Sequence, residues 1–189
     1  MGQHKKKCFA WVVCMNLPNK ITIFRVCMIP VFLVFMLIPG IPFGNYIATA
    51  VFAIACASDA LDGYIARKHN LVTNFGKFMD PLADKCLVTA AMLWFVEIGQ
   101  MPAWALLIVL IREFAVSGLR MVASDKGRVI AAGWSGKVTT ASTRVCIVLM
   151  FLPIPAIVNT ICVWVIALTT LYSGVEYFIK NKDVLNTNK

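Results

Sequence analysis

The feature that most constrains the fold of this chain is a series of six long apolar runs that take up nearly all of its 189 residues. A bilayer core about 30 Å thick needs about 20 helical residues, so each run is long enough to cross it. Hydrophobic residues make up 60% of the chain and charged residues only 14%, which excludes an ordinary soluble domain. The sequence therefore predicts an all-α integral membrane protein with six transmembrane helices, at residues 21–38, 44–66, 80–98, 102–123, 135–152 and 156–179.

Lys and Arg residues fall on alternate sides of the predicted helices. The joints at 39–42, 99–102 and 153–155 contain none, whereas both ends of the chain and the two longer loops are basic. By the positive-inside rule, both termini and these two loops are cytoplasmic. The net charge of +9 is then mainly a topology signal, and nucleic acid binding is not expected because no soluble basic domain exists. We expect a basic interfacial segment at 1–15, a six-helix catalytic domain at 16–180 and a polar tail at 181–189.

Four of the nine acidic residues gather on the two sides of a short polar connection at residues 68–75. On each side, helical spacing places two carboxylates and at least one small residue on one face of a predicted helix. Because the connection is short, the two helices should be antiparallel neighbours whose carboxylates meet at one depth, near the cytoplasmic surface. Pro81 either starts the second of these helices or kinks it. The first face consists of Asp59, Asp62, Gly63 and Ala66, and the second of Gly76, Asp80 and Asp84.

Carboxylates that converge in a site of low dielectric repel one another and need a counter-charge. Oxygen ligands without His or Cys favour Mg²⁺ or Mn²⁺ over zinc, and four carboxylates are enough for two ions. The simpler alternative is that the carboxylates pair with basic residues across the interface, namely Arg67, Lys68, Lys77 and Lys85. A cation transporter is a further alternative, but its acidic site would be expected near the midplane and between repeated elements.

The pattern Asp59-x-x-Asp62-Gly63-x-x-Ala66-Arg67, followed after eight residues by Gly76-x-x-x-Asp80-x-x-x-Asp84, resembles the signature of the CDP-alcohol phosphotransferases. The resemblance implies a six-helix membrane fold, usually homodimeric, with a cytoplasmic active site that uses Mg²⁺ or Mn²⁺. It also implies that Asp59, Asp62 and Asp80 ligate metal. Asp84 would deprotonate the acceptor hydroxyl and contact the second ion.

The same resemblance assigns residues to the CDP-lipid. Gly63 and Gly76 would let the nucleotide approach closely, and Arg67 would face the diphosphate. The full set predicted to bind the CDP-lipid is Asn19, Thr22, Arg25, Gly63, Ala66, Arg67, Gly76 and Lys77.

Three segments outside the signature resemble the phosphatidylglycerophosphate synthases within this family. They are "NLPNKITIFRV" from Asn16, "IREFAVSGLRMVASDKG" from Ile111 and "GWSGKVTT" from Gly133. The predicted reaction is transfer of a phosphatidyl group from CDP-diacylglycerol to sn-glycerol 3-phosphate, with release of CMP. Inositol phosphate, serine and phosphatidylglycerol stay open as alternative acceptors. The acceptor phosphate should contact cations from the fourth and fifth predicted helices, chiefly Arg120 and Lys137, with Arg112 and Arg144.

Overall fold

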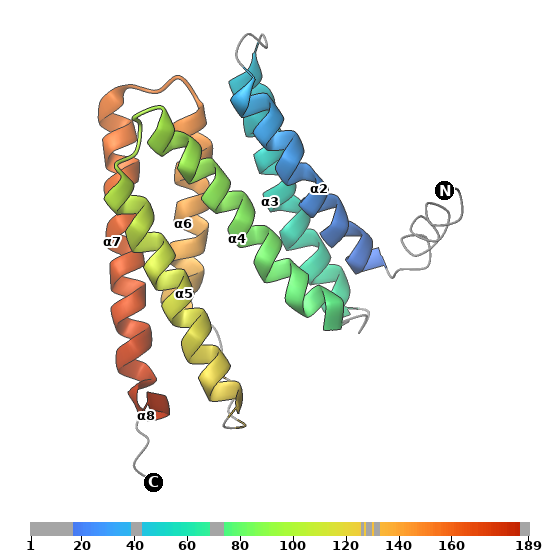
Figure 1. Cartoon of the computed structure of the whole chain (residues 1–189), viewed down its shortest axis with the longest axis vertical. Helices are drawn as coiled ribbons and strands as arrows, with labels where there is room; N and C mark the ends of the chain where they lie inside the picture. The colour runs from blue at the N-terminus through green and yellow to red at the C-terminus, as the bar shows by residue number, and fades with distance from the viewer. Residues whose placement is uncertain are drawn as a thin grey trace, which may run out of the picture. The chain divides into compact units, whose positions relative to one another are not determined.

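The computed structural model describes residues 17–38, 43–68, 74–125, 127, 130 and 133–185, and all regular structure in these residues is helical (Figure 1). Side chains at 17–22, 59–68, 74–78, 80 and 184–185 lie outside the described part. The expected interfacial segment at 1–15 also lies outside it. The helices are α2 (Leu17–Leu37), α3 (Gly44–Lys68), α4 (Asn74–Glu97), α5 (Ala103–Asp125), α6 (Trp134–Phe151), α7 (Ala156–Lys180) and the short α8 (Lys182–Leu185). Each of the six predicted runs corresponds to one of the long helices, so the all-α prediction is confirmed.

The chain divides into two compact units, residues 1–90 and 91–189, and α4 passes from one to the other. In the first unit α2 packs along α3. The ring centroids of Phe32 and Phe52 lie 6.2 Å apart across this pair, and Ala48 and Ala55 are fully buried in α3. Small residues facing large ones let the two helices approach closely.

Helix α4 begins at Asn74, ahead of the residue expected from the apolar run. Pro81 consequently lies inside the helix, which excludes the alternative in which it marks the helix start. After Glu97 the backbone turns at Gly99, whose φ of 74° lies in the left-handed region that glycine adopts without a Cβ clash. This turn leads directly to α5.

In the second unit α5 and α6 each pack against α7 (Figure 1). The α5–α7 contact is centred on a buried cluster of Val116, Leu119 and Ala123 from α5 with Tyr177 from α7. Along the α6–α7 contact, the Thr139 hydroxyl donates a hydrogen bond to the Thr169 carbonyl over 3.0 Å. The predicted acceptor residues of α5 and α6 therefore belong to helices that both pack against α7.

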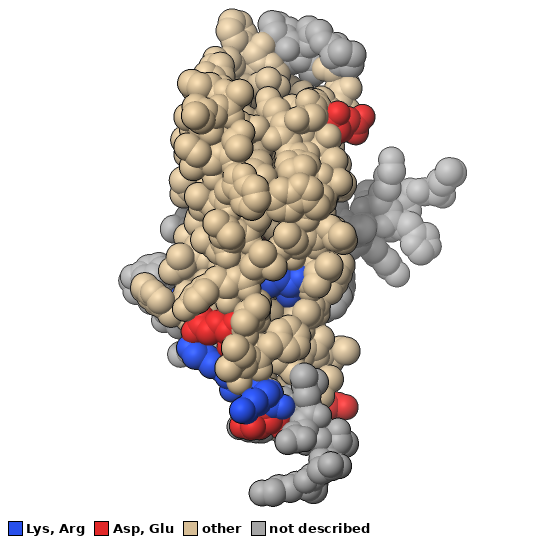
Figure 2. All heavy atoms as spheres, turned by 90° about the vertical axis from the view of Figure 1, so that its left-hand side faces the viewer, with Lys and Arg blue, Asp and Glu red and all other residues tan. Residues whose placement is uncertain are grey.

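By length and composition, α7 is the one helix in the described part that is apolar enough to cross a membrane over its full length. The shorter stretches Ile23–Leu37 and Gly44–Ser58 are also apolar. On the face shown in Figure 2, most of the described charged side chains gather toward the lower end, above which lies a broad uncharged band. The charged residues of α7, Glu176 and Lys180, both lie in its last turns. The prediction of six membrane spans is therefore supported in part, and their orientation stays a prediction.

Candidate functional site

The acidic signature lies on regular helix on both sides of residues 69–73. Helix α3 continues without a break to Lys68, and α4 begins before Gly76. The helical spacing assumed for both carboxylate faces is therefore present in the backbone. The side chains of Asp59, Asp62 and Asp80 lie outside the described residues, as do those of Gly63, Ala66, Arg67, Gly76 and Lys77. Convergence of the four carboxylates accordingly stays a prediction.

Asp84 is the signature carboxylate whose side chain the structure describes. It is half-buried, whereas Ala83 and Leu87 on the same helix are buried at 2% and 0% exposure. Asp84 lies about 15 Å along α4 from Asn74, well inside the regular part of the helix. A carboxylate on a rigid helix and only partly open to water is suited to accept a proton at a defined position.

The donor set of the signature fits a hard divalent cation. Its members are carboxylates, which Mg²⁺ and Mn²⁺ prefer, and the pattern contains no His or Cys that would favour zinc. Among the described side chains, no three acidic, His or Cys residues come together as a metal site. The side chains of Asp59, Asp62 and Asp80 are not among them.

Of the residues of α2 predicted to bind the CDP-lipid, Arg25 alone has a described side chain. It is fully buried at 0% exposure, on the helix that packs along α3. A buried guanidinium requires compensation from polar or anionic groups. Asn19 and Thr22 lie on the same helix with side chains outside the described part.

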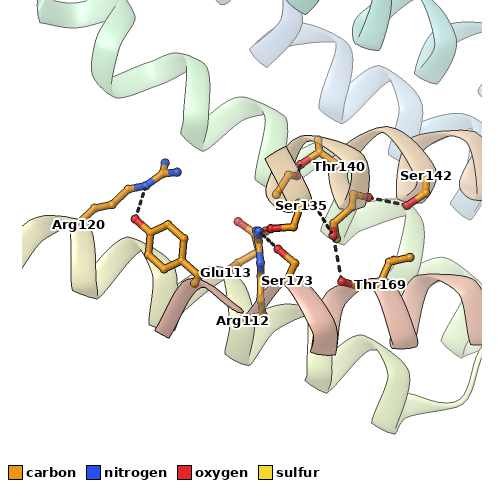
Figure 3. Close-up of polar contacts among 11 residues, drawn as sticks. Arg112, Glu113, Arg120, Ser135, Thr140, Ser142, Thr169 and Ser173 are labelled. Atoms are coloured by element: carbon orange, nitrogen blue, oxygen red, sulfur yellow. Dashed lines mark hydrogen bonds and ion pairs between the residues drawn. The ribbon is translucent and has the colours of Figure 1, made fainter. Parts of the chain in front are cut away.

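The four predicted acceptor residues belong to the second unit, and Arg112 is enclosed by its helices (Figure 3). Its Nη2 donates a hydrogen bond to the Ser173 hydroxyl over 2.7 Å, which joins α5 to α7. Its Nη1 pairs with the Glu113 carboxylate at 2.5 Å. The Arg112 side chain retains 11% exposure, so most of the guanidinium is inside the protein.

Arg120, two helical turns further along α5, is exposed (Figure 3). Its Nε donates a hydrogen bond to the Tyr177 hydroxyl over 3.1 Å, and its Cζ lies 5.7 Å from the centroid of that ring. Among the described residues, its two Nη groups have no hydrogen-bond acceptor. Arg120 is therefore held in orientation while two donor groups stay available to an anion.

Lys137 and Arg144 share one face of α6, since seven residues make about two turns. Lys137 is exposed and lies in the first turn, whereas Arg144 is half-buried deeper in the helix. Helix α6 begins at Trp134, and its N-cap residue, Gly133, provides no side-chain cap. Its first backbone N–H groups, near Lys137, therefore have no side-chain cap.

Sequence reasoning did not single out Ser173, Gly174 or Tyr177 of α7, all of which contact the arginines of α5. The available signal was the pair of small residues Ser173 and Gly174 in an apolar helix, with Tyr177 four positions after Ser173. Small residues in such helices mark close packing. The small residues do not reveal which side chain of a neighbouring helix packs against them.

Comparisons with known proteins agree with the predicted chemistry. The family profile described as CDP-alcohol phosphatidyltransferase matches residues 15–172. A relative from Bacillus subtilis named CDP-diacylglycerol--glycerol-3-phosphate 3-phosphatidyltransferase is 42% identical, over 92% of this chain and 98% of its own. A relative of the same name from Rickettsia bellii is 35% identical, over 86% of this chain and 93% of its own. A Mycobacterium tuberculosis relative named probable phosphatidylglycerophosphate synthase is 38% identical, over 86% of this chain and 79% of its own. The resemblance drawn from the signature is confirmed, and the chain belongs to the CDP-alcohol phosphatidyltransferase family.

Proposed function

We propose that this protein transfers the phosphatidyl group of CDP-diacylglycerol to the hydroxyl of sn-glycerol 3-phosphate, forming phosphatidylglycerol phosphate and CMP. The observation that carries the proposal is the similarity, over most of the chain, to relatives named for this reaction. The complete carboxylate signature on α3 and α4 supports the same chemistry. The role in phospholipid biosynthesis follows from the product.

The family generally uses divalent metal ions, and the carboxylates of α3 and α4 fit such ions. We assign Asp59, Asp62, Asp80 and Asp84 as ligands of two ions, Mg²⁺ or Mn²⁺. When bound, these ions would supply positive charge to the diphosphate oxygens on which negative charge accumulates. A small residue at 63 and at 76 leaves room for the nucleotide beside these carboxylates, and Arg67 and Lys77 supply further positive charge.

In the proposed reaction, Asp84 accepts the proton of the glycerol 3-phosphate hydroxyl, and that oxygen attacks the lipid-side phosphorus. The new P–O bond forms as the bond between this phosphorus and the oxygen that bridges to CMP breaks. CMP leaves with the electron pair. The position of Asp84 on a regular helix supports this role, because a base must be held within hydrogen-bond reach of the hydroxyl.

The acceptor phosphate would be held by the basic residues of the second unit. Arg120 has two free Nη groups among the described residues, and Lys137 lies beside the uncapped start of α6. Their combination suits a phosphate dianion, since a fork of donors, an ammonium and helix N–H groups all favour negative charge. Arg144 lies on the Lys137 face and would contribute from deeper in α6.

For the membrane arrangement, we propose that α2 to α7 all span the bilayer, with both termini and the active site on the cytoplasmic side. Residues 16–180 would form the catalytic domain, and the protein would act as a homodimer in the cell membrane. The basic loops and termini, the apolar composition and the span-length α7 support this arrangement. The diphosphate of a CDP-lipid would then lie at headgroup level, with its acyl chains in the membrane.

A competition assay tests the proposal. Purified protein in detergent is given CDP-diacylglycerol, Mg²⁺ and equal amounts of glycerol 3-phosphate, inositol phosphate, serine and phosphatidylglycerol, and products are identified by mass. We expect phosphatidylglycerol phosphate with one CMP per product. Another phospholipid would keep the carboxylate chemistry but contradict the acceptor assignment, and folded protein that releases no CMP would contradict the proposed function.

A further inference from the structure

We infer that Arg112 is a positioning residue. It holds the first turn of α6 against α5 and α7 and thereby places Lys137 for the acceptor phosphate. The inference rests on the proposed function, because it concerns the phosphate site of that reaction. It differs from direct phosphate binding by Arg112, which the sequence alone predicts.

The hydrogen bonds of Arg112 are directed into the protein. Nη2 donates to Ser173 of α7 at 2.7 Å, and Nη1 donates to Glu113 of its own helix at 2.5 Å. Nε is buried and has no hydrogen-bond acceptor among the described residues. A guanidinium binds phosphate best through two parallel N–H groups, and here one N–H of each Nη is already used.

Two glycines make the space that the side chain occupies. A Cβ at Gly136 of α6 would lie 3.1 Å from Arg112 Nη2, and a Cβ at Gly174 of α7 would lie 3.3 Å from Arg112 Cγ. Both distances are shorter than ordinary van der Waals contact, so any larger residue would displace the side chain or a helix. Arg112 thus fills a notch between α6 and α7, and Ser173 at the notch is 1% exposed.

The notch lies at the start of α6 but in the middle of α5. From Arg112, α5 continues to Asp125, about 20 Å of helix, and α7 continues from Gly174 to Lys180, about 9 Å. Both helices therefore extend past the first turn of α6. At this level Arg112 hydrogen-bonds α5 to α7 and lies against α6.

Lys137 follows Gly136 directly, so the Arg112 contact acts on the helical turn that carries Lys137. Arg120 is set separately, by its hydrogen bond to Tyr177 on the same helix α7. If the first turn of α6 shifts, Lys137 moves relative to Arg120 and the two cations no longer match one phosphate. A displacement of about 1 Å is enough to weaken a positioned site strongly.

The test compares Ser173→Ala, Gly136→Ala and Arg112→Lys in the full-length protein. Arg112→Lys keeps the charge but not the fork of donors. The matched control is Ser142→Ala, because among the described residues the Ser142 hydroxyl bonds only to the Thr139 carbonyl of its own helix, at 3.0 Å. Two readouts are used: the KM for each substrate, and amide hydrogen exchange in peptides covering residues 133–141 and 156–165.

We expect each of the three variants to raise the KM for glycerol 3-phosphate by about tenfold. The KM for CDP-diacylglycerol should change less than about twofold, and exchange should accelerate at 133–141 but not at 156–165. The double variant Arg112→Lys with Ser173→Ala should be no worse than the more affected single variant, because both remove one interaction. Ser142→Ala should match the unmodified protein in both readouts.

Equal increases in the two KM values, or unchanged exchange at 133–141, would overturn the inference. So would a raised KM in Arg112→Lys alone, with Ser173→Ala and Gly136→Ala unaffected, since that result assigns Arg112 to direct phosphate contact. If the unmodified protein makes no product from glycerol 3-phosphate, the proposed function fails. The exchange measurement would still decide whether Arg112 holds α6.

Discussion

Arg120 of α5 and Tyr177 of α7 are joined at two points: the Arg120 Nε donates to the Tyr177 hydroxyl over 3.1 Å, and the guanidinium carbon lies 5.7 Å from the ring centroid. The tyrosine ring is 7% exposed and belongs to the core between the two helices. A core residue thus orients a surface cation. Such orientation lowers the entropy lost when the cation binds an anion.

Tyr177→Phe should weaken acceptor binding without removing any cation. The ring and its packing are kept, but Arg120 loses the hydroxyl that orients it. We expect the KM for glycerol 3-phosphate to rise about three- to tenfold, with little change for CDP-diacylglycerol. Arg120→Ala should raise the same KM further. Tyr172→Phe is the matched control, because Tyr172 is 68% exposed on the same helix. Equal effects of the two Tyr→Phe changes would contradict the role given to Tyr177.

Asp84→Asn should lower turnover by at least about a hundredfold, because the amide cannot accept the proton of the acceptor hydroxyl. Binding of CDP-diacylglycerol, measured directly with labelled lipid, should be largely retained because three other carboxylates remain. Asp125→Asn serves as the control, since Asp125 is exposed at the end of α5. Near-normal turnover of Asp84→Asn would remove Asp84 from the role of base.

Removal of divalent metal should abolish CMP release. Four carboxylates without counter-charge repel one another and leave the diphosphate charge uncompensated. Activity after chelation should return with Mg²⁺ or Mn²⁺, as followed by CMP formation. Turnover that persists in excess chelator, or that returns with Zn²⁺ but with neither of these ions, would contradict the oxygen-ligand assignment.

Two glycines with open space around them should respond oppositely to alanine. A Cβ added at Gly99 or at Gly118 would meet no atom within 4 Å other than those of its chain neighbours and local helix backbone. Backbone conformation therefore decides how each substitution changes stability. Gly99 has a φ of 74°, and Gly99→Ala should lower the free energy of unfolding by about 1 kcal/mol. Gly118 lies inside α5, and Gly118→Ala should raise it by up to about 1 kcal/mol. Unfolding in detergent followed by circular dichroism measures both, and equal shifts would contradict the turn at Gly99.

Much of the fold could be predicted because its signals are local. Apolar runs of span length, separated by Pro and Gly, located all six long helices. The prediction was least accurate at the start of α4. The apolar run begins at Asp80, but the helix begins six residues earlier, in the polar stretch around Gly76. Hydropathy reports burial and lipid contact, so it misses a helical segment that carries a polar site.

The acidic signature was also readable, because helical periodicity relates residues a few positions apart. This is why the family could be recognised from residues 59–84 and was then confirmed over 15–172. The basic residues were harder to interpret. Arg112 and Arg120 look alike in the sequence, as two arginines two turns apart in one apolar helix.

The sequence by itself determined the helices, the family and the carboxylates proposed to carry the chemistry, because each depends on spacing within a short segment. Tertiary structure alone decided the environments of the two arginines. Ser173, Gly136 and Gly174 enclose Arg112, whereas Tyr177 holds an exposed Arg120. These partners come from other helices, and their contacts depend on how the faces of α5, α6 and α7 pack. Packing of that kind leaves no periodic signal in the chain.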